Sequence, residues 1–107
     1  MTTFDDRKDA FEKKFAHDEE LRFKATARRN RMLGQWAAGR LGKSGADADE
    51  YAKSVVMADF EEAGDGDVIR KVMGDLEAGG HKASEAEIRT KLDELLSQAV
   101  TDIQAGR

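Results

Sequence analysis

Apolar residues recur at helical spacing along most of the chain. One set follows an i, i+3, i+4, i+8 pattern, which is typical of the buried face of a helix: Leu33, Trp36, Ala37 and Leu41. This pattern favours Trp36 as a core residue over a ligand platform. Glycine-containing breaks at 42–45, 63–66 and 79–83 separate four such segments. Because short breaks join helices that pack together, the pattern predicts an all-α fold, a four-helix bundle with a long first helix.

The ends of the first two helices follow from their flanking residues. We expect the first helix to run from about Asp18 to Leu41, where Gly42 ends it. The second helix should begin after an Asp47 cap and end at 63–64. Its inward-facing residues are expected to be Tyr51, Ala52, Val55, Val56 and Phe60.

The third and fourth helices carry their own start signals. The third should open at Asp65 or Asp67 and close at 79–80. Its expected buried residues are Val68 or Ile69, Val72, Met73 and Leu76. The fourth has the clearest start, because Ser84 and Glu87 form an S-x-x-E capping box. A continuous apolar stripe follows, made of Ile88, Leu92, Leu95, Leu96, Ala99 and Ile103.

The first 17 residues differ from the rest of the chain. If they are helical, Phe4, Phe11 and Phe15 fall within about 40° of one another on one stripe. Little else in the segment can be buried and no strong cap precedes it, so we expect a mobile, helix-prone arm at 1–17 and a bundle at 18–107. Two interpretations stay open: the rings enter a groove on a partner, or they pack back onto the protein's own body.

Composition limits the class of protein. The chain has 107 residues, of which 39% are hydrophobic, many of them alanine, and this indicates one domain with a small core. It has no cysteine, which excludes disulfides and thiolate chemistry. No apolar run approaches the roughly 20 residues that span a bilayer, and the N-terminus lacks a secretory signal. We therefore expect a soluble, cytoplasmic protein without membrane insertion.

Charge is distributed unevenly. Residues 1–43 carry 11 Lys and Arg against 7 Asp and Glu, whereas residues 44–107 carry 7 against 15. The basic half includes a tract without acidic residues, formed by Arg22, Lys24, Arg28, Arg29 and Arg31. We interpret this tract first as a contact surface for the acidic half or for a protein partner. A phosphate site ranks below that, and the pI of about 5.2 argues against a nucleic-acid partner.

The sequence offers little for catalysis. His17 and the acidic residues after it lack the spacing of a metal site, and an acidic first turn explains them better. The run from Gly64 to Asp67 lacks the lysine and hydroxyl of a phosphate-binding loop. No nucleophile lies near a base in sequence. We therefore expect a non-enzyme without cofactors.

Short strings along most of the chain carry a resemblance to a known family. They are TFDDR at 3–7, FAHD at 15–18, ARRNR at 27–31, GQWAA at 34–38, SGADAD at 44–49, ADFEE at 58–62 and AEIR at 86–89. In this order and with these short gaps, the chain resembles the ATPase inhibitor subunit zeta family of alphaproteobacteria. The resemblance implies the same four-helix fold that the apolar pattern predicts.

The resemblance also implies a function and a partner. A protein of this family would bind the catalytic head of the F-type ATP synthase, formed by alpha, beta and gamma subunits, and would block ATP hydrolysis from a position peripheral to the inner membrane. Its arm would enter a catalytic interface through the residues Phe4, Asp5, Asp6, Arg7, Lys8, Phe11, Lys13, Lys14 and Phe15. A softer hypothesis is weak adenine-nucleotide sensing by Arg28, Arg29 and Arg31. The alternative is a helical adaptor for another assembly, with weak or no inhibition.

Overall fold

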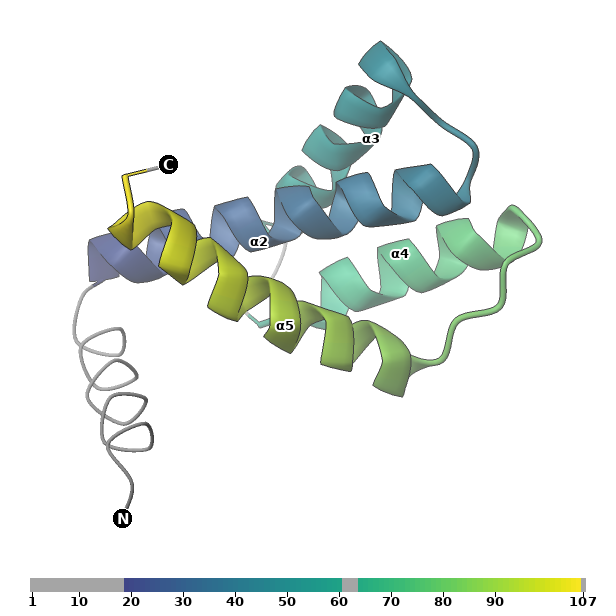
Figure 1. The fold of residues 1–107 in the computed structure, drawn as a ribbon. Helices are drawn as coiled ribbons and strands as arrows, with labels where there is room; N and C mark the ends of the chain where they lie inside the picture. Colours follow the sequence, from purple (N-terminus) through teal and green to yellow (C-terminus); the bar gives the residue numbers. More distant parts are fainter. Residues whose placement is uncertain (1–18, 61–63, 107) are drawn as a thin grey trace.

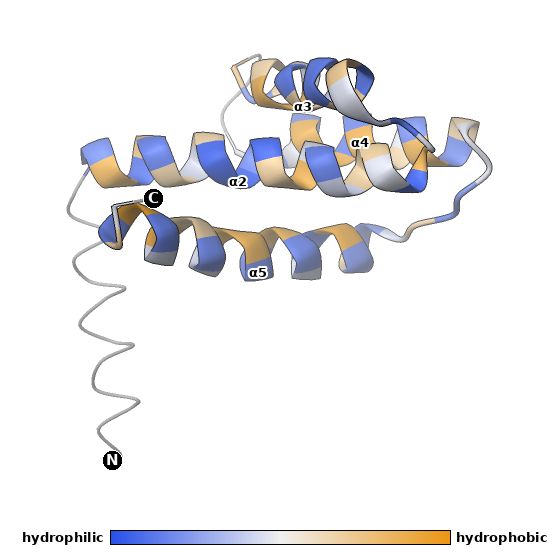
Figure 2. Cartoon of the chain, turned by 45° about the horizontal axis from the view of Figure 1, so that its top comes forward, coloured by the Kyte–Doolittle hydropathy of each residue, from blue (hydrophilic) through white to orange (hydrophobic). Residues whose placement is uncertain are grey.

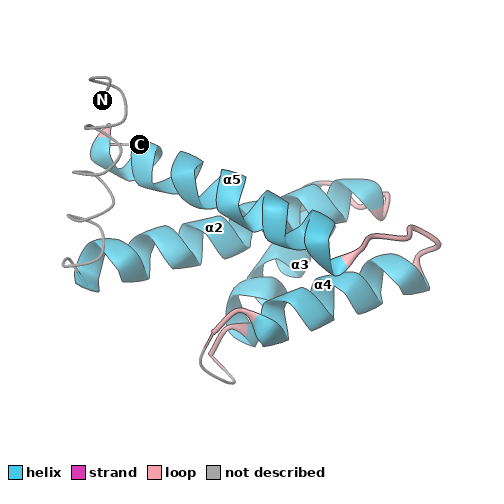
Figure 3. Cartoon of the chain, turned by 90° about the horizontal axis from the view of Figure 1, so that it is seen from below, coloured by secondary structure: helices cyan, strands magenta, loops and turns pink. Residues whose placement is uncertain are grey.

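The fold is known from a computed structural model, which describes residues 19–60 and 64–106. These residues form four helices, which are α2 (Glu19–Arg40), α3 (Gly45–Ala58), α4 (Gly66–Ala78) and α5 (Glu85–Gln104) (Figure 1). Figure 3 shows only helices and loops in this described part. The predicted all-α fold with a long first helix is therefore confirmed. The expected arm at 1–17 lies outside the described residues.

Two hydrophobic clusters hold the helices together. The main cluster draws on all four helices and contains Leu33, Ala37, Val55, Val68, Ile69, Val72, Leu76, Ile88 and Leu92. A smaller cluster joins only the start of α2 to the end of α5, through Leu21, Ala25, Ala99 and Val100. Figure 2 shows the hydrophobic side of α5 turned toward α2. Within residues 19–60 and 64–106, the bundle therefore has a four-helix end and a two-helix end.

Helix lengths explain this division. α2 has 22 residues and α5 has 20, whereas α3 has 14 and α4 has 13. A difference of six to nine residues corresponds to about 9–14 Å along a helix axis. The first turns of α2 therefore extend beyond α4 and pack mainly on α5, as the side-by-side purple and yellow ends in Figure 1 show.

The α2 and α3 helices approach each other closely at Gly34. A Cβ atom at this position would lie 2.6 Å from the Ala52 Cα atom, so α2 and α3 would have to move apart to admit one. Gly34 is buried inside α2, and its backbone is not in the left-handed region. Glycine is therefore required here by the short distance between two backbones.

Most predicted helix ends are confirmed. Gly42 follows α2 with a φ of +77°, and Ser84 Oγ accepts a 3.1 Å hydrogen bond from the Glu87 backbone N–H. Asp65 is the N-cap residue of α4. The Asp47 cap was wrong, because Ser44 occupies the N-cap of α3 and Asp47 lies in the first turn.

Phe60 does not face the core. Its side chain is 62% exposed, so the predicted inward position was wrong. The physical reason is that α3 ends at Ala58, earlier than expected, and Phe60 lies in the turn beyond it. Helical periodicity therefore does not apply to this residue.

Trp36 packs at the edge of the main cluster. Two cations lie over its ring, with the Arg40 guanidinium carbon 4.6 Å and the Lys91 Nζ 5.6 Å from the ring centre. Cations at these distances are attracted by the electron-rich face of indole. Trp36 therefore joins α2 to α5 and is a partly buried core residue, as its spacing predicted.

Candidate functional site

The basic tract of α2 divides between a buried network and an open groove. Arg29 is 6% exposed and Asn30 is fully buried. Arg22 and Arg31 are exposed, and Arg28 lies between these extremes. Because residues on one helix point in different directions, adjacent arginines serve different surfaces.

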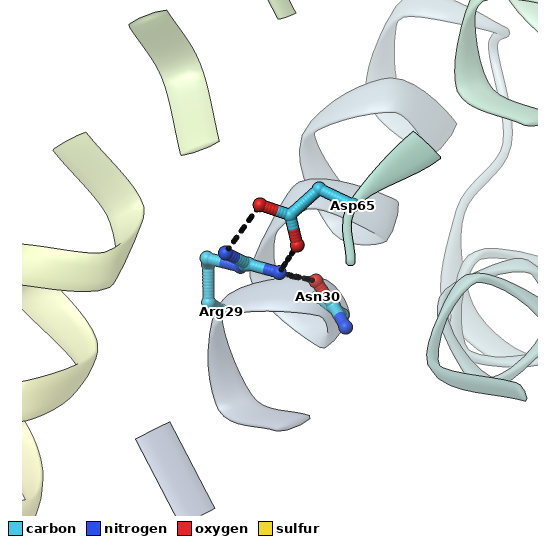
Figure 4. Close-up of polar contacts among 3 residues, drawn as sticks. All are labelled: Arg29, Asn30 and Asp65. Carbon is cyan, nitrogen blue, oxygen red and sulfur yellow. Dashed lines mark hydrogen bonds and ion pairs between the residues drawn. The ribbon is translucent and has the colours of Figure 1, made fainter. Parts of the chain in front are cut away.

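Arg29 forms the network at the centre of Figure 4. Its Nη2 donates to Asp65 Oδ1 at 2.7 Å and its Nη1 donates to Asp65 Oδ2 at 3.4 Å. Its Nε and Nη2 also donate to Asn30 Oδ1, at 3.1 and 2.9 Å. Planar two-pronged binding of a carboxylate is the strongest use of a guanidinium. The network therefore ties the start of α4 to the middle of α2.

Asp59 completes the acidic side of this network. Burial raises the pKa of the Asp59 carboxyl above its usual value, and the nearby Arg29 guanidinium lowers it by less. The Asn30 Nδ2 atom has no hydrogen-bond partner of normal length in the described part of the chain. It still lies near enough to the Asp59 carboxylate to lower that group's pKa. The end of α3 and the start of α4 thus both meet α2 at one polar cluster.

A groove of about 830 Å³ runs along α2 on another side. Its floor consists of α2 residues from Lys24 to Gln35, and its walls carry Val56 of α3 and Ile103 of α5. Apolar side chains of Ala27 and Met32 lie among the basic ones. This mixture of apolar and basic lining residues suits an amphipathic or anionic occupant.

Among the described helices, α3 and α5 both contact α2 but not each other, and the groove lies between them. Arg28 and Asp102 form the link between its floor and the α5 wall, with Nη2 3.7 Å from Oδ2. Lys24 pairs with Glu20 at 2.9 Å, one turn earlier on α2. The lining residues Lys24, Arg28, Arg31 and Asp102 together give the groove an excess of positive charge.

The predicted site residues fall into three places. Arg28 and Arg31 line the groove, whereas Arg29 is committed to Asp65. The arm set lies outside the described residues: Phe4, Asp5, Asp6, Arg7, Lys8, Phe11, Lys13, Lys14 and Phe15. Within 19–60 and 64–106, no cluster of three or more His, Cys, Asp or Glu side chains is arranged to hold a metal ion.

Sequence reasoning missed Asn30, Met32 and Ile103 as parts of these surfaces. Asn30 carried one usable signal, because an amide on the apolar side of a helix is buried only when a partner meets it. The residues of the groove walls carried no such signal in the sequence, because the groove depends on how three helices are placed relative to one another. Among the described helices, none combines the length and apolar character needed to cross a bilayer.

Comparison with known sequences decides the family. The sequence model of the ATPase inhibitor subunit zeta family matches residues 1–102. The chain belongs to the ATPase inhibitor subunit zeta family. The match includes both the N-terminal segment and all but the last residues of α5.

Solved structures agree with the fold of this zeta family member. One structure, determined in solution by NMR, is 48% identical in sequence and has a TM-score of 0.71. The alignment covers 81% of this chain and 99% of that chain. None of the curated protein sequences matches the chain.

Proposed function

We propose that this protein is a regulatory subunit that binds the catalytic head of the F-type ATP synthase and inhibits ATP hydrolysis. The observation that carries the proposal is the family match over residues 1–102, because it includes the N-terminal segment together with the bundle. The partner surface lies on the alpha, beta and gamma subunits. The protein acts without a cofactor or catalytic residues of its own, in the cytoplasm and peripheral to the inner membrane.

The inhibitory element in this proposal is the arm at 1–17. Phe4, Phe11 and Phe15 form an apolar stripe at helical spacing, which is how an amphipathic helix enters a hydrophobic groove. Charged residues flank the stripe and pair with the walls of a catalytic interface: Asp5, Asp6, Arg7, Lys8, Lys13 and Lys14. An ordered helix at that interface blocks the opening and closing that rotation requires.

The bundle at 18–107 has the role of an anchor. Its main cluster joins all four helices, and the Arg29 and Asp65 pair fixes α4 to α2. A rigid body of this kind limits how far an attached arm advances into a cleft. The division of labour therefore assigns inhibition to the arm and positioning to the bundle.

Deletion of residues 2–17 tests this division. ATP hydrolysis by the cognate enzyme, depleted of its own zeta subunit, is measured with the full-length and the shortened protein. We expect inhibition to disappear with the deletion while the thermal unfolding transition stays within a few degrees. Inhibition that survives the deletion would assign the activity to the bundle instead. Co-purification with another assembly, without binding to the ATPase, would support the adaptor alternative.

A second candidate function is weak binding of adenine nucleotide in the groove. The observation that favours it is the position of Arg28 and Arg31 on the groove floor beside Lys24, because clustered cations bind phosphates. Titration of ATP into the labelled protein should shift the groove amides saturably. The Arg31→Ala variant should weaken this effect, and Arg22→Ala, which removes an arginine outside the groove, should not. Amide shifts without saturation would remove the idea.

A further inference from the structure

The groove beside α2 matches another part of the same chain. We propose that it holds residues 1–17 when the protein is away from its target, so that the apolar stripe of the arm is stored against α2. The contact itself is independent of the enzyme, and only its regulatory meaning rests on the proposed function. Four arguments support this occupant. They are the equal lengths of the groove and the stripe, the charges of the arm and the groove, the reach of the connecting residues, and the tethering of the arm beside the groove.

The lengths of groove and stripe agree. The stripe from Phe4 to Phe15 covers 11 residue steps, and the groove floor from Lys24 to Gln35 also covers 11. At 1.5 Å per residue, each is about 16 Å long when helical. A helical arm lying along the groove would therefore place all three rings over its floor. Met32, Val56 and Ile103 supply the apolar atoms that the rings would meet.

The charges of the two surfaces are complementary. On a helical arm, Asp5 and Glu12 lie about 80–100° to one side of the stripe, with Lys8 between them and the stripe, and Arg7 and Lys14 lie about 60–80° to the other side. The carboxylates of Asp5 and Glu12 suit the groove lining, in which the basic residues Lys24, Arg28 and Arg31 outnumber the single acidic residue, Asp102. An uncharged or uniformly charged segment would not match in this way.

The connection is short enough. α2 begins at Glu19, so only residues 16–18 separate Phe15 from the first turn of α2. A helix that reverses through about three residues lies antiparallel to its neighbour, and such connections are common in bundles. The four chain steps from Phe15 to Glu19 span up to about 13–14 Å, which allows an antiparallel arm to lie shifted by about 7.5 Å along α2, with Phe15 near Lys24 and Phe4 near Gln35.

Because the arm is tethered beside the groove, even a weak contact keeps it docked in most molecules. A short linker gives an effective concentration of the order of 1 mM. A contact with a dissociation constant near 0.1 mM would therefore be closed in about nine molecules of ten. A second copy of the chain would compete only at comparable protein concentrations, which favours the chain's own arm as the occupant.

A spin label at residue 2 tests the placement directly. The chain has no cysteine, so Thr2→Cys gives a single labelling site in the full-length protein. We expect paramagnetic broadening to be strongest for the amides of Gln35 and Val56, at the end of the groove far from the arm's attachment. The amide of Glu20, at the arm's end of α2 and about 22 Å from Gln35 along the helix axis, should be broadened much less (Figure 1). All samples are free of nucleotide, because adenine nucleotide is the other candidate occupant of this groove and would compete with the arm.

Matched variants separate docking from the effect of the tether. A triple variant keeps the tether unchanged but combines Phe4→Ala, Phe11→Ala and Phe15→Ala. We expect it to lose the broadening at Gln35 and Val56. Ala27→Glu, which fills the groove floor, should have the same effect, whereas Ala86→Glu on α5 should leave the broadening intact. The triple variant leaves the bundle untouched, so it decides the question even if Ala27→Glu fails to fold.

Two results would overturn the proposal. The first is broadening at Gln35 and Val56 that is equal in the wild type and in the triple variant. The second is broadening seen only when spin-labelled protein without isotopes is mixed with isotopically labelled protein that carries no spin label, which would identify a second copy as the occupant.

A stored arm should also delay inhibition, so Ala27→Glu should inhibit several-fold faster than Ala86→Glu. Complete lack of inhibition would instead refute the proposed function and leave the NMR result standing.

Discussion

Asp65→Asn is the most informative change to the bundle, because it removes one charge from a partly buried ion pair and keeps the shape of the side chain. The Arg29 side chain is 7% exposed, and Asp65 is 39% exposed. Asp65 is the N-cap residue of α4, but its side chain makes no capping hydrogen bond, so the substitution removes no cap. The variant therefore isolates the ion pair.

The expected cost follows from these exposures. Removing one partner of a fully buried ion pair destabilises a protein by about 3–5 kcal/mol. Here water reaches the Asp65 side, and the two bonds to Asn30 remain, so we expect about 2 kcal/mol. In a domain of this size, that loss corresponds to a fall in Tm of about 8–16 °C.

Urea unfolding followed by circular dichroism at neutral pH measures this cost. Asp93→Asn, which alters an exposed aspartate in α5, is the matched control and should change the free energy of unfolding by less than about 0.5 kcal/mol. A cycle with Arg29→Met should give a coupling energy of about 1.5–2 kcal/mol. If Asp65→Asn unfolds at the same urea concentration as Asp93→Asn, the pair does not stabilise the fold and the reasoning is refuted.

Three further changes test separate features by the same unfolding assay. Gly34→Ala should lower stability by about 1–3 kcal/mol, because a methyl group meets the α3 backbone at 2.6 Å, while Gly74→Ala, with open space around it, should raise it by about 0.5–1 kcal/mol. Ser84→Ala should cost about 1 kcal/mol through its lost cap, and Ser97→Ala in mid-helix should be nearly neutral. Asp59→Asn should stabilise the protein at neutral pH, because a raised pKa means that the fold disfavours the charged carboxyl. That advantage should shrink as the pH falls through the Asp59 pKa, and an advantage that grows at low pH would contradict the assignment.

Local signals predicted the helices well because each acts within a few residues. Gly42 ends α2 and Ser84 begins α5, as expected, since both depend on the backbone of one turn. The same logic failed at the two ends of α3. Asp47 and Ser44 are both suitable caps, and sequence does not rank them, while the end at Ala58 placed Phe60 outside the helical pattern.

The candidate site depended on contacts between distant residues. The basic tract was interpreted first as a surface for the acidic half of the chain, and Arg29 with Asp65 and Arg28 with Asp102 are such contacts. Sequence did not show that Arg29 is buried while Arg31 is exposed, because that depends on which side of α2 the other helices cover. The groove depends likewise on the placement of three helices.

The central claim is that the phenylalanine stripe inhibits the ATPase. Its most direct test is ATP hydrolysis by the zeta-depleted cognate enzyme with wild-type protein, with Phe4, Phe11 and Phe15 changed to alanine, and with Phe23→Ala combined with Phe60→Ala. The last variant removes two rings that are 64% and 62% exposed on the bundle, and it controls for the general loss of aromatic surface. We expect inhibition by the wild type and by this control, and none by the arm variant. Full inhibition by the arm variant would contradict the account.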